Sequence, residues 1–268
     1  MNRLLGKYGL MLLFLGMAGC TEFFVKPDRQ DQWKIRESDL IVLHYREPGF
    51  SDHPSPTPGE AAFILDNQML YYRAIQDSIH RDFSEKVLIY LHNQDEAVTH
   101  IGTGGGGHSI PKFNAFYFSF FHAGREYTDQ YGVENPFLGA HELVHVISHQ
   151  TLGYPGTKLM SEGYANWLDG SYAKYDIRAI FLSYRDNEPE KIMTPDELLF
   201  QTERPDEVYY PNAGVFTAFL VRHYRIEKVN RLFTSGKEVF ISDFGRIFDE
   251  SWEEMNEKYA LYTERLSP

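Results

Sequence analysis

Five consecutive residues, His141-Glu142-Leu143-Val144-His145, place two imidazoles and a carboxylate at a spacing that can support chemistry. On a helix, His141 and His145 lie on one face, one turn apart, so both rings can reach a single metal ion. Glu142 lies about 100° round the helix from His141, where it can approach a water on the metal without binding the metal. The motif predicts a metal centre with Glu142 as general base.

A catalytic metal needs a third protein ligand, and the segment Ser161-Glu162-Gly163-Tyr164-Ala165 supplies a carboxylate at the start of the next predicted helix. Glu162 lies seventeen positions after His145, which is enough for a turn and an antiparallel return. Two histidines and one glutamate leave the fourth position of a tetrahedral zinc open for water. We therefore predict a Zn²⁺ site at His141, His145 and Glu162. The alternative is a helix whose two histidines make ordinary hydrogen bonds.

The segments HELVH (141–145) and SEGYANWLDG (161–170) resemble the gluzincin metallopeptidases. That family has a zincin-like fold in which a small sheet packs beside two zinc-bearing helices. The resemblance implies His141, His145 and Glu162 as zinc ligands and Glu142 as general base, in agreement with the prediction from the motif. The metzincin pattern fails, because Ser148 and Thr151 occupy the places of its glycine and its third histidine.

The resemblance extends loosely over residues 57–268 and implies a further catalytic group. In related proteins a tyrosine that follows the zinc helices faces the metal, and Tyr210 takes that place in this chain. It would stabilise the oxyanion that forms when water attacks a carbonyl. Tyr209 and His223 are the alternatives.

Gluzincins often orient the first zinc histidine with an acidic or amide side chain four residues after the ligand glutamate. Asn166 occupies that position here, and Asp169 is the alternative. Such partners of a ligand change metal affinity by roughly ten- to a hundredfold. His149 shares the face of the two ligand histidines, but we expect it to lie too far along the helix to reach the same metal.

The glycine run Gly104–Gly107 precedes an aromatic stretch, Phe113–Phe121. In gluzincins the strand at this point lies at the sheet edge and pairs with an extended substrate, and glycines leave room for that approach. The run lacks the lysine and hydroxyl residue of a phosphate loop, so no nucleotide is expected. Aminopeptidases of this kind hold the free ammonium of the substrate with a glutamate just before the edge strand. Residues 101–110 of this chain contain no acid, which favours cleavage inside a peptide over removal of residues from its amino terminus.

The first twenty residues have the layout of a secretory signal. Arg3 and Lys7 precede a ten-residue apolar run, Tyr8–Met17, which is too short to span a bilayer. The following Ala-Gly-Cys20 resembles the lipobox of bacterial lipoproteins, although Met17 replaces the usual leucine. The resemblance implies a signal peptide over residues 1–19, lipid attachment at Cys20 and an extracytoplasmic tether in the bacterial cell envelope, with the outer membrane favoured. An ordinary cleaved signal and an uncleaved anchor are the alternatives.

Charge and cysteine content exclude several classes of protein. The chain has 26 basic and 38 acidic residues, a net charge of −12, and no basic footprint for nucleic acid. Its single cysteine excludes a disulfide scaffold and a zinc site built from thiolates. The expected partners are a peptide or protein substrate and, through the lipid anchor, a membrane.

The elements that must position these residues follow from capping signals and apolar patterns. Strands are expected within Asp39–Tyr45, at Val87–Leu91 and over Phe113–Phe121. Helices are expected from Thr57 to about His80, over Phe137–Gln150, from Ser161, over Asn212–Tyr224 and over Asp243–Leu266. Because strands come early and helices late, we predict an α+β domain over residues 57–268, preceded by a tether and irregular segment over residues 20–56.

These features together predict a zinc metallopeptidase tethered outside the cytoplasm. One alternative is a non-catalytic lipoprotein that keeps the zinc fold as a binding or assembly module. A second is a zinc amidase that acts on cell-wall material. The intact histidines and glutamates of the motif argue against a decayed site.

Overall fold

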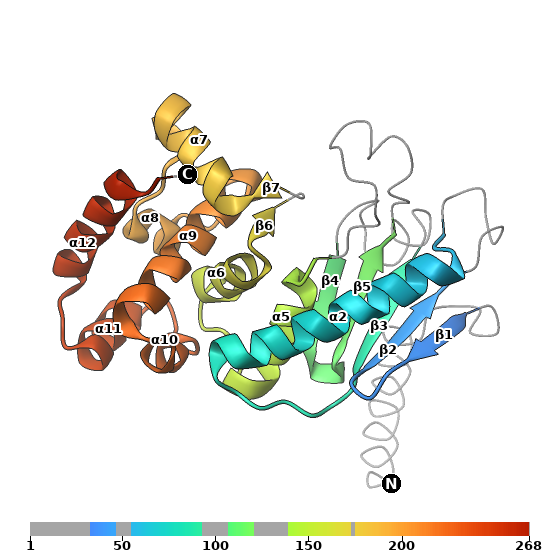
Figure 1. Cartoon of the computed structure of the whole chain (residues 1–268). Coiled ribbons are helices and arrows are strands. Elements are labelled where there is room, and N and C mark those ends of the chain that lie inside the picture. Colours follow the sequence, from blue (N-terminus) through green and yellow to red (C-terminus); the bar gives the residue numbers. More distant parts are fainter. Residues whose placement is uncertain (1–32, 47–54, 93–106, 121–138, 173–174, 268) are drawn as a thin grey trace, which may run out of the picture.

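The computed structural model describes residues 33–46, 55–92, 107–120, 139–172 and 175–267. A mixed sheet forms the N-terminal part and helices form most of the C-terminal part (Figure 1). The expected α+β class is therefore confirmed.

Several expectations concern residues outside this described part. They include the signal peptide over residues 1–19, the lipid attachment at Cys20 and most of the glycine run, Gly104–Gly107. Within the described residues, no helix combines the length and apolar character that crossing a membrane requires.

The sheet has five strands in the order β1-β2-β3-β5-β4. The inner strands β2, β3 and β5 are parallel, and the two outer strands run antiparallel to their neighbours. The strands are β1 (Lys34–Glu37), β2 (Ile41–Tyr45), β3 (Val87–His92), β4 (Gly107–Ile110) and β5 (Ala115–Ser119). The strands expected within Asp39–Tyr45 and at Val87–Leu91 are confirmed, and the sheet begins upstream of the expected domain boundary at residue 57.

The aromatic stretch Phe113–Phe121 is not the edge of the sheet, contrary to expectation. It begins in a 3-10 turn, η2 (Pro111–Phe113), and its strand β5 lies between β3 and β4. Phe116 packs into the main core on one face of β5, and Tyr117 packs into a second aromatic cluster on the other face. A strand that is apolar on both faces is buried on both, so it takes an inner place. The edge is β4.

Helix α2 (Pro58–Ile79) crosses one face of the sheet (Figure 1). Its expected capping box is present: the Glu60 backbone N–H donates to Thr57 Oγ1 at 3.2 Å, and the Thr57 N–H donates to Glu60 Oε2 at 2.7 Å. The helix ends at His80, which has a left-handed φ of 51°. Both expected boundaries are therefore confirmed.

The other helices and a small hairpin follow the sheet. The hairpin strands are β6 (Ser171–Tyr172) and β7 (Tyr175–Asp176). The helices are α5 (His141–Leu152), α6 (Lys158–Asp169), α7 (Ile177–Asn187), η3 (Pro189–Lys191), α8 (Pro195–Phe200), α9 (Asp206–Tyr224), α10 (Ile226–Leu232), α11 (Phe240–Phe248) and α12 (Trp252–Arg265). Helices α5 and α6 lie between the sheet and the remaining helices (Figure 1).

Three expected helix starts were wrong. Helix α5 begins at His141 and not at Phe137, because the described residues directly before it, Gly139 and Ala140, are not helical. Helix α6 begins after Thr157, whose side chain accepts a hydrogen bond from the Met160 N–H at 3.2 Å, and Ser161 lies inside the helix. Helix α9 begins six residues before Asn212 and includes Pro211. Proline cannot donate to the carbonyl four residues earlier, at Glu207, and the Tyr184 hydroxyl donates to that carbonyl at 3.0 Å instead.

The expected last helix, Asp243–Leu266, is two helices. Asp249 adopts a left-handed φ of 59° and ends α11. Ser251 and Glu254 then form a capping box that starts α12 in a new direction.

Gly163, next to the predicted ligand Glu162, allows α6 to pack closely on α9. A Cβ at this position would overlap the Thr217 hydroxyl and lie 3.2 Å from the Ala213 carbonyl oxygen. We expect Gly163→Ala to lower the free energy of unfolding by about 1–3 kcal/mol, because a methyl group there overpacks the interface. Chemical denaturation measures this change.

The matched control is Gly59→Ala in the first turn of α2. A Cβ at Gly59 meets nothing closer than Thr57 Oγ1 at 3.9 Å, so this variant should unfold at the same or a higher denaturant concentration. Equal destabilisation by both substitutions would show that close packing at Gly163 is not the cause.

Candidate metal centre

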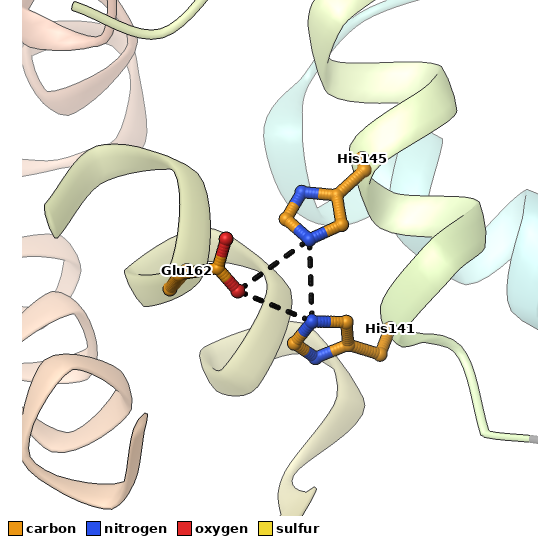
Figure 2. A group of neighbouring side chains, drawn as sticks. All are labelled: His141, His145 and Glu162. Carbon is orange, nitrogen blue, oxygen red and sulfur yellow. Dashed lines mark hydrogen bonds and ion pairs between the residues drawn. The ribbon is translucent and has the colours of Figure 1, made fainter. Parts of the chain in front are cut away.

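Helices α5 and α6 bring the three predicted ligands together, with their polar atoms directed toward a common point (Figure 2). His141 Nε2 lies 3.2 Å from His145 Nε2. Glu162 Oε2 lies 3.3 Å from His141 Nε2 and 3.6 Å from His145 Nε2. A tetrahedral zinc about 2.0–2.1 Å from each ligand atom would separate those atoms by about 3.3–3.4 Å. The three side chains therefore fit one such ion.

Burial and charge prepare this group for a cation. Glu162 Oε2 is buried and lies within ion-pair distance of both imidazole Nε2 atoms. Burial acts to raise the pKa of Glu162, but the imidazoles of His141 and His145 outweigh it and hold that pKa below its ordinary value. Burial also lowers the pKa of His141, yet the carboxylates around it, led by Glu162, raise this pKa to about 8. A buried anion between two imidazoles favours positive charge at this point.

The carboxylate of Asp169, at the end of α6, fixes the start of α5. It accepts hydrogen bonds from the Ala140 backbone N–H and, at 2.6 Å, from the Ser171 hydroxyl. A Cβ on Gly139 would collide with this carboxylate, so glycine gives it room. Asp169 therefore satisfies the N–H of Ala140, the residue that precedes the helix, and anchors the start of α5.

Asn166, the predicted partner of the first zinc histidine, uses its amide within its own helix. Its Nδ2 donates to the Glu162 carbonyl at 2.8 Å, and its buried Oδ1 lacks a hydrogen-bond partner among the described residues.

Ser161 was expected only as a helix cap, but its hydroxyl lies 3.4 Å from His145 Nδ1. With Nε2 directed to a metal, Nδ1–H of His145 can donate to that hydroxyl. The position of Ser161 directly before Glu162 was the only signal in the sequence for this contact.

Glu142 lies between the ligand group and the edge of the sheet. A Cβ on Gly107 of β4 would be 2.6 Å from Glu142 Cγ, 2.8 Å from its Oε1 and 2.7 Å from Phe118 Cδ2. The edge strand therefore passes against the predicted general base, and this close approach requires glycine.

Tyr210 reaches the site from α9. Its ring stacks on that of His141, with centroids 5.7 Å apart and planes 20° apart, and meets Tyr172 edge-on. Burial, followed by the charge of Glu162, raises the pKa of Tyr210 above its ordinary value, so its hydroxyl keeps its proton. The alternative, Tyr209, is buried and donates to the Leu198 carbonyl at 2.6 Å, as a core residue does.

The other two histidines that the sequence analysis considered do not join the ligand group. His149 packs against Tyr154 and Phe233, and burial followed by the charge of His145 lowers its pKa to about 4. His223 lies near the other end of α9, where Nδ1 is 3.0 Å from the Phe219 carbonyl oxygen.

Among the described residues, His141, His145 and Glu162 form the one cluster of histidine, cysteine or acidic side chains that could hold a metal ion. No model of a known protein family matches the chain, and no curated protein matches it.

Proposed function

We propose that this chain is a zinc-dependent hydrolase with a zincin-like fold of the gluzincin type, and that it cleaves peptide bonds. The observation that carries the proposal is the convergence of His141, His145 and Glu162 within 3.2–3.6 Å of one another. Imidazole and carboxylate ligands in this number suit a catalytic zinc with one open position. Peptide hydrolysis by the zinc-loaded chain, and its loss after chelation, tests the proposal.

The residues around the ligands take distinct roles in this proposal. Bound zinc supplies a Lewis acid that polarises a carbonyl group. Glu142 takes the proton of the attacking water and passes it to the leaving amine. Tyr210 donates a hydrogen bond to the oxyanion. Asp169 holds the start of α5 in place, next to His141. Ser161 orients His145 through its contact with Nδ1.

The edge strand β4 supports an extended peptide as substrate. It runs antiparallel to β5, and Gly107 places its backbone against Glu142. A peptide that adds to this edge would present its backbone to the general base. Residues 101–106, directly before β4, contain no acid to hold a free amino terminus, so we propose cleavage inside a peptide.

Removal of the Tyr210 hydroxyl tests its role in the reaction. We expect Tyr210→Phe to lower kcat by about 10²–10³-fold, as loss of one oxyanion donor does, and to leave KM nearly unchanged. Steady-state hydrolysis of a quenched fluorogenic peptide provides both constants.

The neighbouring Tyr209→Phe is the matched control. It leaves the Leu198 carbonyl without its donor, so it should lower stability by about 1–3 kcal/mol and keep kcat close to that of the native chain. A larger fall in kcat for Tyr209→Phe than for Tyr210→Phe would reverse the assignment.

We also propose that Cys20 carries the lipid that tethers the hydrolase, on the basis of its place after a ten-residue apolar run. In bacteria that are fed a labelled fatty acid, the native chain should take up label and Cys20→Ser should not. Recovery of unlabelled, soluble native protein with its first nineteen residues intact would refute the tether.

A further inference from the structure

A pocket of about 490 Å³ lies among α7, α9 and α12, away from the metal ligands. Of these helices, α12 lies on the side of the helical part that is farther from the sheet (Figure 1). Its polar lining is basic, and no acidic side chain of the described chain belongs to it. The basic groups are Arg178, Arg222, Lys258 and Arg265, with His223 beside them.

Most of this positive charge is available to a ligand. Arg222 and Arg265 are exposed and make no hydrogen bond or ion pair with the residues that the structure describes. Arg178 donates to the Ser267 carbonyl, which carries no charge. Of the four basic groups, only Lys258 has an anionic partner among the described residues, Glu250 Oε2 at 2.8 Å.

Such a cluster is unfavourable without an anion, because like charges at one pocket repel. It is also unexpected in a chain whose net charge is −12. Guanidinium groups bind phosphate oxygens through paired hydrogen bonds, and Tyr262 adds an aromatic wall that can face an organic group. The volume lies within the range of about 300–1,000 Å³ that small-molecule sites occupy.

We propose that this pocket binds a phosphate group, carried either by a small organic phosphate or by a phospholipid head. The site is separate from the metal centre. Tyr210 and His223 are thirteen residues apart on α9, which corresponds to about 20 Å of helix. Phosphate binding here therefore does not depend on the hydrolase proposal.

The test compares two double variants with the same change in charge, each in a Cys20→Ser background that excludes lipidation. Arg222→Glu with Arg265→Glu reverses charge in the pocket. Arg73→Glu with Lys112→Glu reverses it on exposed residues of the sheet part. Calorimetry with glycerol 3-phosphate measures binding of a soluble phosphate. Sedimentation with phosphatidylglycerol vesicles, against phosphatidylcholine vesicles, measures binding of a lipid head.

We expect at least one of these ligands to bind the Cys20→Ser chain. Its affinity for the pocket variant should be at least tenfold lower, and its affinity for the control variant should stay within twofold of that for the Cys20→Ser chain. Binding of glycerol 3-phosphate would identify a soluble phosphate as the ligand, and binding of vesicles alone would identify a lipid head. Equal losses in both double variants, or no binding of either ligand to the Cys20→Ser chain, would overturn the proposal. An unchanged melting temperature and zinc content would show that the pocket variant remains folded.

Discussion

The variant Glu142→Gln is expected to bind zinc as the native chain does and to hydrolyse peptides about 10²–10⁴-fold more slowly. Glutamine keeps the size of the side chain and its packing against Gly107, but an amide cannot accept the proton of the attacking water. The fall should appear in kcat/KM for a quenched peptide. Zinc content measured on the same preparation serves as the control.

Two outcomes would contradict this role of Glu142. Native rates in Glu142→Gln would show that the carboxylate is not the base. Absence of peptide hydrolysis by both proteins, with zinc bound to each, would favour a binding or assembly module or an amidase with another substrate.

Replacement of a metal ligand should have a different signature. His141→Ala, His145→Ala and Glu162→Ala are each expected to lose both the bound zinc and the hydrolytic activity. Zinc at 100 times its dissociation constant would stabilise the native chain by about 2.7 kcal/mol, and these variants should lack that stabilisation. Elemental analysis and thermal denaturation with and without zinc measure the two effects.

His149→Ala is the matched control for the ligand variants. His149 lies one turn beyond His145 on α5 and contacts Tyr154 and Phe233, and it is outside the ligand group. This variant should keep about one zinc per chain. Loss of zinc from His149→Ala, or its retention by the three ligand variants, would contradict the assigned ligand set.

The residues of the candidate site could be predicted because their signals are local. The spacing of His141 and His145 places both on one face of a helix, and Glu162 lies on the next helix, after the chain reverses direction. The capping box at Thr57 predicted the start of α2 for the same reason. These predictions depend on a few neighbouring residues and little on packing.

The contacts that the partners of the ligands make could not be predicted in the same way. Asp169 was considered only as an alternative to Asn166, and its contact with the Ala140 N–H, 29 residues away, exists only once α5 and α6 have packed. The contact of Ser161 with His145 depends on the same packing. The place of β5 inside the sheet depends on apolar contacts on both of its faces.

Two helix boundaries were missed for more specific reasons. The signal Ser251-Trp-Glu-Glu254 was present in the sequence, but the apolar pattern on both sides suggested one continuous helix. Pro211 favoured a later start for α9, and only the fold shows that the Tyr184 hydroxyl satisfies the carbonyl that the proline leaves without a donor.

The most direct test of the central claim is a titration of metal-free protein with zinc, followed by the rate of hydrolysis of a peptide mixture. We expect no cleavage before zinc is added, a linear rise in rate and saturation at about one equivalent. The cleavage products should begin or end at positions inside the original peptides, without release of single terminal residues. Equal hydrolysis without metal, or no cleavage of any peptide bond at saturating zinc, would contradict the assignment of a zinc-dependent peptidase.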